Sequence, residues 1–295
     1  MPTDAPHTAT PTAGLILCGG RSSRMGMDKA QLRFPGGALL DRMRHAVGAV
    51  AEPLVLALAA KQVLEPLPAG VHTVRDATPF EGPLWGLAEG FRLLQGQAEQ
   101  VLVTPVDLPF FTPAWIQPLL DGMAGHDVCL YRWEGVVNPL VGVYRLSLLD
   151  KLERLIAAGL RRPLALSTGS RTRHVELESL WTPEQGPAPL MDVDTPEDYR
   201  AALLAEGIGD RTGAEITVQV HAPPGLNAAT IPLPLRAAHA DQIVPWVLQL
   251  YPDWMQAARS AGRGPVVHRD GDSRGGGGTV PADLHRGDRL RLDWR

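Results

Sequence analysis

Short apolar runs alternate with longer amphipathic segments through the first two thirds of the chain. Unbroken apolar runs of strand length are typical of parallel strands that are covered on both faces. Parallel strands need crossover connections, usually helices, so the alternation predicts βαβ units in a mostly parallel sheet. The predicted strands are residues 14–18, 53–59, 71–75, 100–105, 128–131 and 140–144, and the predicted helices are residues 39–51, 83–94, 113–123 and 147–158.

Length, charge and cysteine content limit the class of protein. A chain of 295 residues can form one large domain and a smaller one. Its 28 basic and 32 acidic residues are well mixed, which gives no basic footprint for nucleic acid. No apolar run approaches the roughly 18 residues of a membrane span. Cys18 and Cys129 lie in apolar runs, which favours buried thiols in a reducing compartment. We therefore expect a cytoplasmic protein that acts on small molecules.

The composition predicts four segments. Residues 1–12 are rich in Pro, Thr and Ala and are expected to form a disordered leader. Residues 13–205 form the main domain, and the glycine-rich residues 206–213 form a linker. Residues 214–295 read as a small α+β domain of order ββαββ. Its predicted elements are strands 215–221 and 229–235, an amphipathic segment 240–261, and strands 265–268 and 288–294.

The first predicted strand ends in a double glycine, within the string GGRSSRMGMDK at residues 19–29. Without a Cβ atom, Gly19 and Gly20 let backbone N–H groups approach a phosphate or a base closely. Arg24 supplies a planar fork and Lys29 a compact point charge, a pairing suited to a triphosphate. The glycines alone are better explained as a tight βα turn with solvated arginines. The whole string favours a polyphosphate site.

Three aspartates are candidate metal ligands. Asp107 follows an apolar strand, and the carboxyl ends of parallel strands form the ligand crevice of such sheets. Magnesium typically takes one or two carboxylates together with phosphate oxygens and water. Asp192 and Asp194 flank Val193, so in an extended segment both point to the same side, and one of them could complete the site of Asp107. The alternative for Asp107 taken alone is a turn or cap residue.

Gly82 and Asn138 each have two interpretations, whereas Thr195 and Pro196 have one. Gly82 precedes a proline in the first turn of a predicted helix, which places free N–H groups near a ligand or simply packs a βα turn. Asn138 either binds a ligand or caps its own turn. Thr195 and Pro196 predict a helix start, with Thr195 as the N-cap, whatever the neighbouring aspartates do.

Five segments in order resemble the motifs of the molybdenum cofactor guanylyltransferases, in the superfamily with the nucleoside-diphosphosugar transferase fold. The resemblance extends over about residues 13–205. It implies an α/β, Rossmann-like, mostly parallel sheet. The segments are LILCGGRSSRMGMDK (residues 15–29), DATPFEGPLWGL (76–87), VTPVDLPF (103–110), NPLVGVY (138–144) and DVDTPED (192–198).

The resemblance implies Mg²⁺-dependent transfer of GMP from GTP to molybdopterin, with release of pyrophosphate. It implies no nucleic-acid or membrane partner, and transient contacts with other cofactor-biosynthesis proteins or molybdoenzymes. The implied catalytic residues are Arg24, Lys29 and Asp107. The implied nucleotide-binding residues are Leu17, Cys18, Gly19, Gly20, Lys29, Asp76, Gly82 and Asp107. The implied metal ligands are Asp107 and Asp194, and the implied substrate-binding residues are Asn138 and Asp192.

The motifs leave alternatives open. The double glycine is typical of the guanylyltransferases, whereas cytidylyltransferases of the same pathway usually carry Ala-Ala-Gly at this turn. Asp192 and Asp194 stand where guanylyltransferases often carry asparagines, and related cytidylyltransferases more often carry Asp-x-Asp-Thr. GTP is the preferred nucleotide. The alternatives are a cytidylyl- or sugar-nucleotidyltransferase of the same fold, and a non-catalytic nucleotide-binding regulator.

The ββαββ order of residues 214–295 resembles that of small β-grasp proteins, including the sulfur-carrier subunit of molybdopterin synthase. Such carriers end in a flexible Gly-Gly that forms the thiocarboxylate, whereas this sequence ends in Asp293-Trp294-Arg295. We therefore expect no sulfur transfer, and a docking or substrate-presenting module is the remaining hypothesis.

Overall fold

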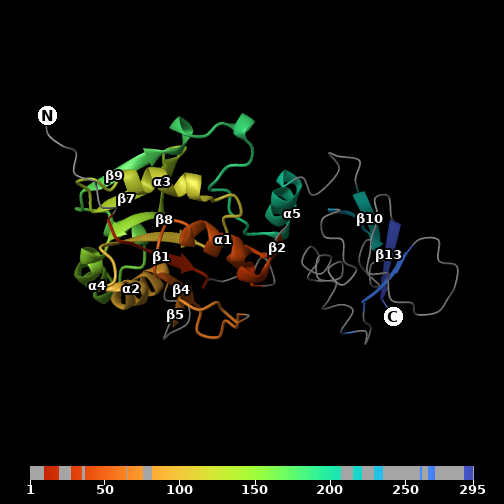
Figure 1. Ribbon diagram of the computed structural model, residues 1–295, viewed down its shortest axis with the longest axis horizontal. Helices are drawn as coiled ribbons and strands as arrows, with labels where there is room; N and C mark the ends of the chain where they lie inside the picture. Colours follow the sequence, from red (N-terminus) through yellow and green to blue (C-terminus); the bar gives the residue numbers. More distant parts are fainter. Residues whose placement is uncertain are drawn as a thin grey trace. The chain divides into compact units, whose positions relative to one another are not determined.

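A computed structural model describes residues 10–19, 28–34, 37–64, 66–75, 82–206, 215–220, 229–234, 260, 265–269 and 289–294 (Figure 1). The chain divides by contact into two compact units, which are described separately. The first unit is Met1–Arg21 with Leu39–Met191, and the second is Ser22–Ala38 with Asp192–Arg295. Residues 1–9 of the predicted leader and nearly all of the predicted segment 240–261 lie outside the described residues. The leader was predicted to extend to residue 12, which is wrong at its end, because Thr12 begins β1 and the carbonyl oxygen of Pro11 accepts hydrogen bonds from Glu99 and Gln100. No helix in the described part of the chain is long and apolar enough to cross a membrane.

The first unit contains a seven-stranded sheet of order β5-β4-β1-β6-β8-β7-β9 (Figure 1). Neighbouring strands run parallel except at β8, which is antiparallel to both β6 and β7. The prediction of a mostly parallel sheet is therefore confirmed. The strands are β1 (Thr12–Leu17), β4 (Leu54–Leu58), β5 (Val71–Arg75), β6 (Gln100–Pro105), β7 (Val128–Trp133), β8 (Val136–Arg145) and β9 (Thr172–Glu176).

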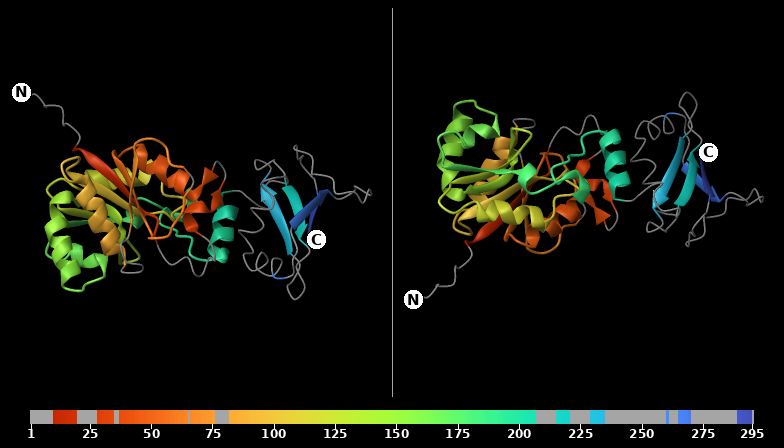
Figure 2. Two further views of the ribbon diagram at one scale, coloured as in Figure 1. Left: turned by 90° about the horizontal axis from the view of Figure 1, so that it is seen from below. Right: turned by 90° about the horizontal axis from the view of Figure 1, so that it is seen from above.

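Helices cover both faces of this sheet. On one face α2 (Pro83–Leu94) contacts β1, β4 and β5 and packs against α4 (Leu149–Ala157). On the other face α1 (Leu39–Gly48) contacts β1 and β4, and α3 (Pro113–Asp121) contacts β7 and β8 (Figure 2). The layered arrangement explains why the central strands are apolar along their whole length. Short 3₁₀ helices are η1 (Lys29–Gln31), η2 (Leu146–Leu148), η3 (Pro163–Leu166), η4 (Leu177–Ser179) and η5 (Pro183–Gln185).

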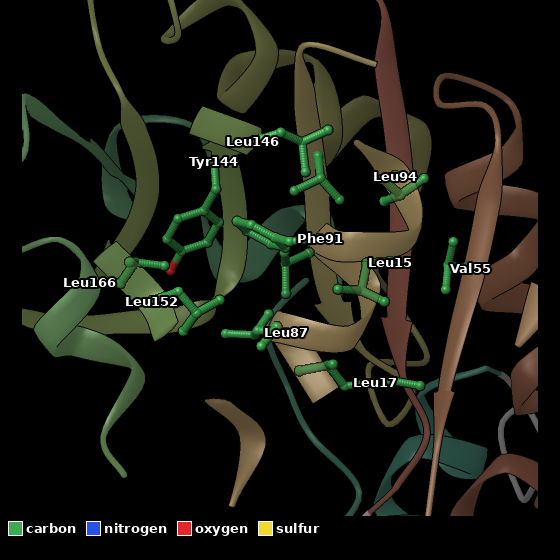
Figure 3. Close-up of a cluster of buried hydrophobic side chains, with 14 of the residues drawn as sticks. Leu15, Leu17, Val55, Leu87, Phe91, Leu94, Tyr144, Leu146, Leu152 and Leu166 are labelled. Atoms are coloured by element: carbon green, nitrogen blue, oxygen red, sulfur yellow. The ribbon is translucent and has the colours of Figure 1, made fainter. Parts of the chain in front are cut away.

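The core between α2 and the sheet is built around Phe91. Its ring lies between Leu15 of β1 and Tyr144 of β8, and all three side chains are fully buried (Figure 3). The ring centroids of Phe91 and Tyr144 are 6.3 Å apart. Burying a side chain of this size stabilises a fold by about 1.5–3 kcal/mol. The cluster therefore fixes α2 against the central strands.

In the second unit, α5 (Pro196–Ala205) begins as predicted, with Thr195 as its N-cap. A short hairpin of β2 (Arg33–Phe34) and β3 (Gly37–Ala38) carries Phe34, whose ring meets that of Tyr199 edge-on, with centroids 5.4 Å apart. A four-stranded sheet has the order β11-β10-β13-β12, with β10 and β13 parallel. Its strands are β10 (Glu215–Val220), β11 (Ala229–Pro234), β12 (Pro265–Arg269) and β13 (Arg289–Trp294).

Among the elements that differ from the prediction are β8, β9 and α1. The strand β8 begins at Val136, before the predicted residue 140, because a tight turn joins it to β7. Glu134 and Gly135 both adopt positive φ in that turn, at 50° and 75°. The strand β9 was not predicted, because it is an edge strand with exposed residues and lacks an apolar run. The helix α1 ends at Gly48, three residues before the predicted end.

Two helical glycines should respond in opposite ways to alanine. A Cβ atom at Gly90 would lie 2.6 and 2.7 Å from the Cδ atoms of buried Leu15, whereas one at Gly48 would meet nothing within 4 Å. Alanine gains about 1 kcal/mol of helix propensity, and overpacking costs about 1–3 kcal/mol. We expect Gly90→Ala to lower the free energy of unfolding in urea, and Gly48→Ala to leave it unchanged or raise it. Equal behaviour of the two variants would contradict the close packing of α2 on β1.

Candidate active site

The carboxyl ends of β1 and β6 lie side by side. Leu17 pairs with Pro105 in the parallel ladder, and the N–H of Val106 donates to the carbonyl oxygen of Leu17 at 3.1 Å. Gly19 and Asp107 each follow that pair by two residues, on strands that are about 5 Å apart. The predicted residues Leu17, Cys18, Gly19 and Asp107 are therefore brought together at one edge of the sheet.

The start of the glycine turn is bonded to the end of β4. The N–H groups of Cys18 and Gly19 both donate to the carbonyl oxygen of Ala57, at 2.8 and 3.1 Å. A Cβ atom at Gly19 would lie 2.9 Å from the backbone nitrogen of Ala59. Glycine is thus needed here for close packing on β4. The N–H of Gly19 is bonded within the sheet, while the residue itself is exposed.

Asp107 is held by its neighbours in sequence. Val106 and Leu108 are 3% and 1% exposed and anchor the backbone on either side, while Asp107 itself is only partly buried. Asp107 is therefore fixed in its backbone and partly accessible at the carboxyl edge of the sheet. Oxygen ligands of this kind suit Mg²⁺, which completes its coordination with phosphate oxygens and water. Among the described residues, no three or more His, Cys, Asp or Glu side chains are grouped so that they could hold a metal ion.

Asn138 lies on β8, the strand next to β6. Gly142 pairs with Val103, and the same antiparallel register, continued, would bring residue 138 opposite residue 107. The side-chain oxygen of Asn138 accepts a hydrogen bond from the N–H of Leu140 at 3.1 Å. This local contact lies within β8 and places one hydrogen bond on the amide oxygen of Asn138.

Gly82 sets the start of α2 at the same side of the sheet. It has φ of 94° and ψ of 172°, a conformation that L-residues rarely adopt. Space is not the constraint, because the nearest atom to a Cβ here would be the carbonyl oxygen of Arg161 at 3.6 Å. Pro83 occupies the first turn, and no side chain caps the helix, as predicted. In sequence, α2 is the next helix or strand after β5.

In the second unit, two predicted site residues bind each other. The ammonium group of Lys29 donates to Oδ1 of Asp194 in a short ion pair. The side chains are 14% and 42% exposed, so the lysine is mostly buried and the carboxylate stays accessible. Val193 is fully buried and Asp192 is exposed, which agrees with aspartates that point away from the core on either side of Val193.

Asp198 supports this pair, and the sequence analysis did not identify it. Its Oδ2 accepts hydrogen bonds from the N–H groups of Asp194 and Thr195, at 3.1 and 2.8 Å, and from the Thr195 hydroxyl at 2.8 Å. Burial raises the pKa of the Asp198 carboxyl, but these hydrogen bonds and the charge of Lys29 outweigh it and lower the pKa below its usual value. The Thr-x-x-Asp spacing of a capping box was the available signal.

Three further candidates are not described by the structure, and the two cysteines are. Gly20, Arg24 and Asp76 lie outside the described residues. Neither cysteine forms a disulfide bond, and both are buried, as predicted. Burial raises the pKa of the Cys129 thiol to about 11, so this residue is an unreactive core group at neutral pH.

Comparisons with known proteins agree with this geometry. Residues 14–175 match the family described as MobA-like NTP transferase domain. A probable molybdenum cofactor guanylyltransferase of Mycobacterium ulcerans is 33% identical over 199 residues, which cover 66% of this chain and 94% of that protein. One from Mycobacterium tuberculosis H37Rv is 36% identical over 170 residues, covering 56% and 83%.

One solved structure extends the comparison to the fold. Molybdopterin-guanine dinucleotide biosynthesis protein A from Archaeoglobus fulgidus superposes with a TM-score of 0.53 at 22% identity, covering 64% of this chain and 96% of that chain. At this identity the likeness shows the fold alone. It confirms the predicted nucleotidyltransferase architecture.

The packing of Gly19 gives a prediction for the turn. In Gly19→Ala the new methyl group would press on backbone atoms of Leu58 and Ala59, which have no rotamer to change. We expect a loss of about 1–3 kcal/mol in the free energy of unfolding. The measurement is urea unfolding followed by circular dichroism. Wild-type stability in this variant would contradict the packing of the turn on β4.

The pKa of Asp198 gives a pH-dependent prediction. A carboxylate with a lowered folded-state pKa stabilises the fold at neutral pH, and the contribution disappears as pH falls through that lowered value. We expect Asp198→Asn to cost about 1 kcal/mol at pH 7, and the difference from wild type to narrow below about pH 3.9. Urea titrations at pH 7 and pH 3 check this. A difference that is equal at both pH values would argue against the charged cap.

Proposed function

The chain belongs to the family of MobA-like NTP transferase domains, and on that premise we propose that it transfers GMP from GTP to the terminal phosphate of molybdopterin. Pyrophosphate is the leaving group. The observation that carries the proposal is the alignment of Gly19 and Asp107 on neighbouring strand ends. A glycine turn beside a carboxylate at the carboxyl edge of a parallel sheet is a suitable place for a nucleotide and its metal.

NTP transferases of this kind use a divalent metal, and we assign Mg²⁺ to Asp107. Bound there, the ion would neutralise charge on the triphosphate oxygens. Leu17, Cys18, Gly19, Gly20, Asp76 and Gly82 are the residues that we assign to the nucleotide pocket. The role of Asp107 is to hold its carboxylate at a fixed point of the crevice, which its buried neighbours in sequence make rigid.

Arg24 and Lys29 are the proposed cations for the triphosphate. Lys29 is paired with Asp194 in the structure. We propose that a triphosphate, with its higher charge, draws the ammonium group away from Asp194. Asp194 then becomes available as the second proposed metal ligand. Such an exchange leaves no buried charge without a partner in either state, which lowers the cost of moving the lysine.

Transfer proceeds by in-line attack of the acceptor phosphate on the α-phosphorus. The attacking phosphate is already ionised near neutral pH, so no general base is required. Asn138 and Asp192 are the residues that we assign to the acceptor. The work left to the protein is positioning and charge stabilisation.

The proposed substrates are GTP and molybdopterin, and the proposed location is the cytoplasm, in keeping with two buried cysteines that form no disulfide bond. For residues 214–295 we retain a β-grasp-like domain with a docking role as the proposal. The sheet order β11-β10-β13-β12, with parallel β10 and β13, supports it. Transient contacts with other cofactor-biosynthesis proteins or with molybdoenzymes would use this domain.

The second candidate function is cytidylyl transfer, which Asp192 and Asp194 favour. A competition assay separates the two: the protein receives equal GTP and CTP, Mg²⁺ and molybdopterin, and the dinucleotide products are resolved by chromatography. We expect the guanine dinucleotide, together with an equal amount of pyrophosphate. A cytosine dinucleotide would establish the alternative, and binding without pyrophosphate release would establish a regulator.

The ion-pair exchange predicts opposite effects on its two partners. Lys29→Ala should weaken GTP binding by about tenfold or more, since a charge-assisted contact of about 1.5–3 kcal/mol is lost. Asp194→Asn should keep or improve binding of GTP without metal, because the lysine is no longer held, but should lower turnover with Mg²⁺. Isothermal titration with and without Mg²⁺ measures GTP binding by both variants. Pyrophosphate release measures the turnover of Asp194→Asn. Parallel losses in both variants without metal would refute the exchange.

A further inference from the structure

The loop that follows β4 is tied to the glycine turn by one side chain. Nε2 of Gln62 donates to the carbonyl oxygen of Cys18 at 3.1 Å, and its Oε1 accepts from the N–H of Ala59 at 3.1 Å. Both ends of the amide are therefore used, one on each strand end. Gln62 lies 44 residues from Cys18 in sequence, and no motif of the sequence analysis included it.

A second side chain extends this contact to β5. Nη1 of Arg75 donates to the carbonyl oxygens of Ala59 and Gln62, at 3.2 and 2.8 Å. Arg75 is the last residue of β5 and directly precedes Asp76, a proposed nucleotide-binding residue. Cys18, Ala59, Gln62 and Arg75 together form what we term the Gln62 brace. It joins the carboxyl ends of three neighbouring strands, β1, β4 and β5.

The Gln62 brace fixes the peptide between Cys18 and Gly19, which leads into the glycine turn. Gly19 is packed against the nitrogen of Ala59, and that same nitrogen donates to Gln62. The peptide between Cys18 and Gly19 therefore has its carbonyl bonded to Gln62 and its N–H bonded to Ala57. With both groups occupied, the orientation of this peptide is fixed, and with it the direction in which the chain leaves towards Gly20.

From this we propose that Gln62, supported by Arg75, is a positioning residue for the nucleotide. It binds Cys18 through its side chain and Arg75 through its backbone carbonyl, the residues that directly precede Gly19 and Asp76 in sequence, without itself touching the ligand. The inference rests on the proposed function, because it assumes that these segments bind a nucleoside triphosphate. Displacements of about 1 Å in such segments have large effects on binding and rate.

A matched control exists in the same unit. Nε2 of Gln95 donates to the carbonyl oxygen of Leu146 at 3.0 Å, at the opposite end of α2 from Gly82. Gln62→Glu and Gln95→Glu each replace an amide donor by a carboxylate of equal size. Gln62→Glu keeps the acceptor for Ala59 but places an oxygen against the carbonyl of Cys18. A merely structural role predicts similar effects of the two changes.

The experiment is titration of the full chain with Mg·GTP and with Mg·CTP, with the melting temperature of each variant measured in parallel. We expect Gln62→Glu and Gln62→Leu to raise the Kd of the preferred nucleotide roughly tenfold, and Gln95→Glu to change it less than twofold. The KM for molybdopterin should stay at the wild-type value. Arg75→Met should weaken nucleotide binding, and Arg75→Lys should restore part of it, since an ammonium group can still donate to the carbonyls.

The outcomes separate the positioning role of Gln62 from the proposed function of the chain. Unchanged nucleotide binding in Gln62→Glu, or an equal change in Gln95→Glu, would overturn the positioning role and leave the proposed function intact. Preference for CTP in wild type would change the proposed nucleotide, but the effect of Gln62 would still be measured. Wild-type protein that binds neither nucleotide would overturn both.

Discussion

The parallel pairing of β1 with β4 on one side and β6 on the other is the constraint on which the rest of the first unit depends. Leu17 pairs with both Ala57 and Pro105, so three strands end at one level. Burial on both faces fixes that register, because a slip by one residue would exchange the side chains of the two faces. The glycine turn, Asp107 and the Gln62 brace all begin where these strands stop.

Charged groups of the second unit are paired with one another. Lys29 is bound to Asp194, and Asp198 is stabilised as a carboxylate by the cap of α5. A mostly buried lysine without a carboxylate would pay a large desolvation cost, so the pair keeps the cation available at low cost. In the proposed function, a triphosphate replaces Asp194 as the partner of Lys29.

Sequence patterns predicted most elements of the first unit. The bounds of β5 agree with the prediction to the residue, although this edge strand is largely exposed and Val71 and Val74 are its only apolar residues. The bounds of β6 and α2 also agree to the residue, because an apolar run and a helical proline mark them. The edge strand β9 has no such signal. At the site, the motifs located Gly19 and Asp107, but the pairing of Lys29 with Asp194, 165 residues away, and the contact of Gln62 with Cys18 depend on tertiary structure.

The most direct test of a magnesium-dependent nucleotide site at the ends of β1 and β6 is the metal dependence of GTP binding in wild type and in Asp107→Asn. Isothermal titration with Mg²⁺ and with chelator gives both values. The account predicts that Mg²⁺ strengthens binding to wild type and has little effect on Asp107→Asn. Equal strengthening by Mg²⁺ in both proteins would contradict the assignment of the metal to Asp107.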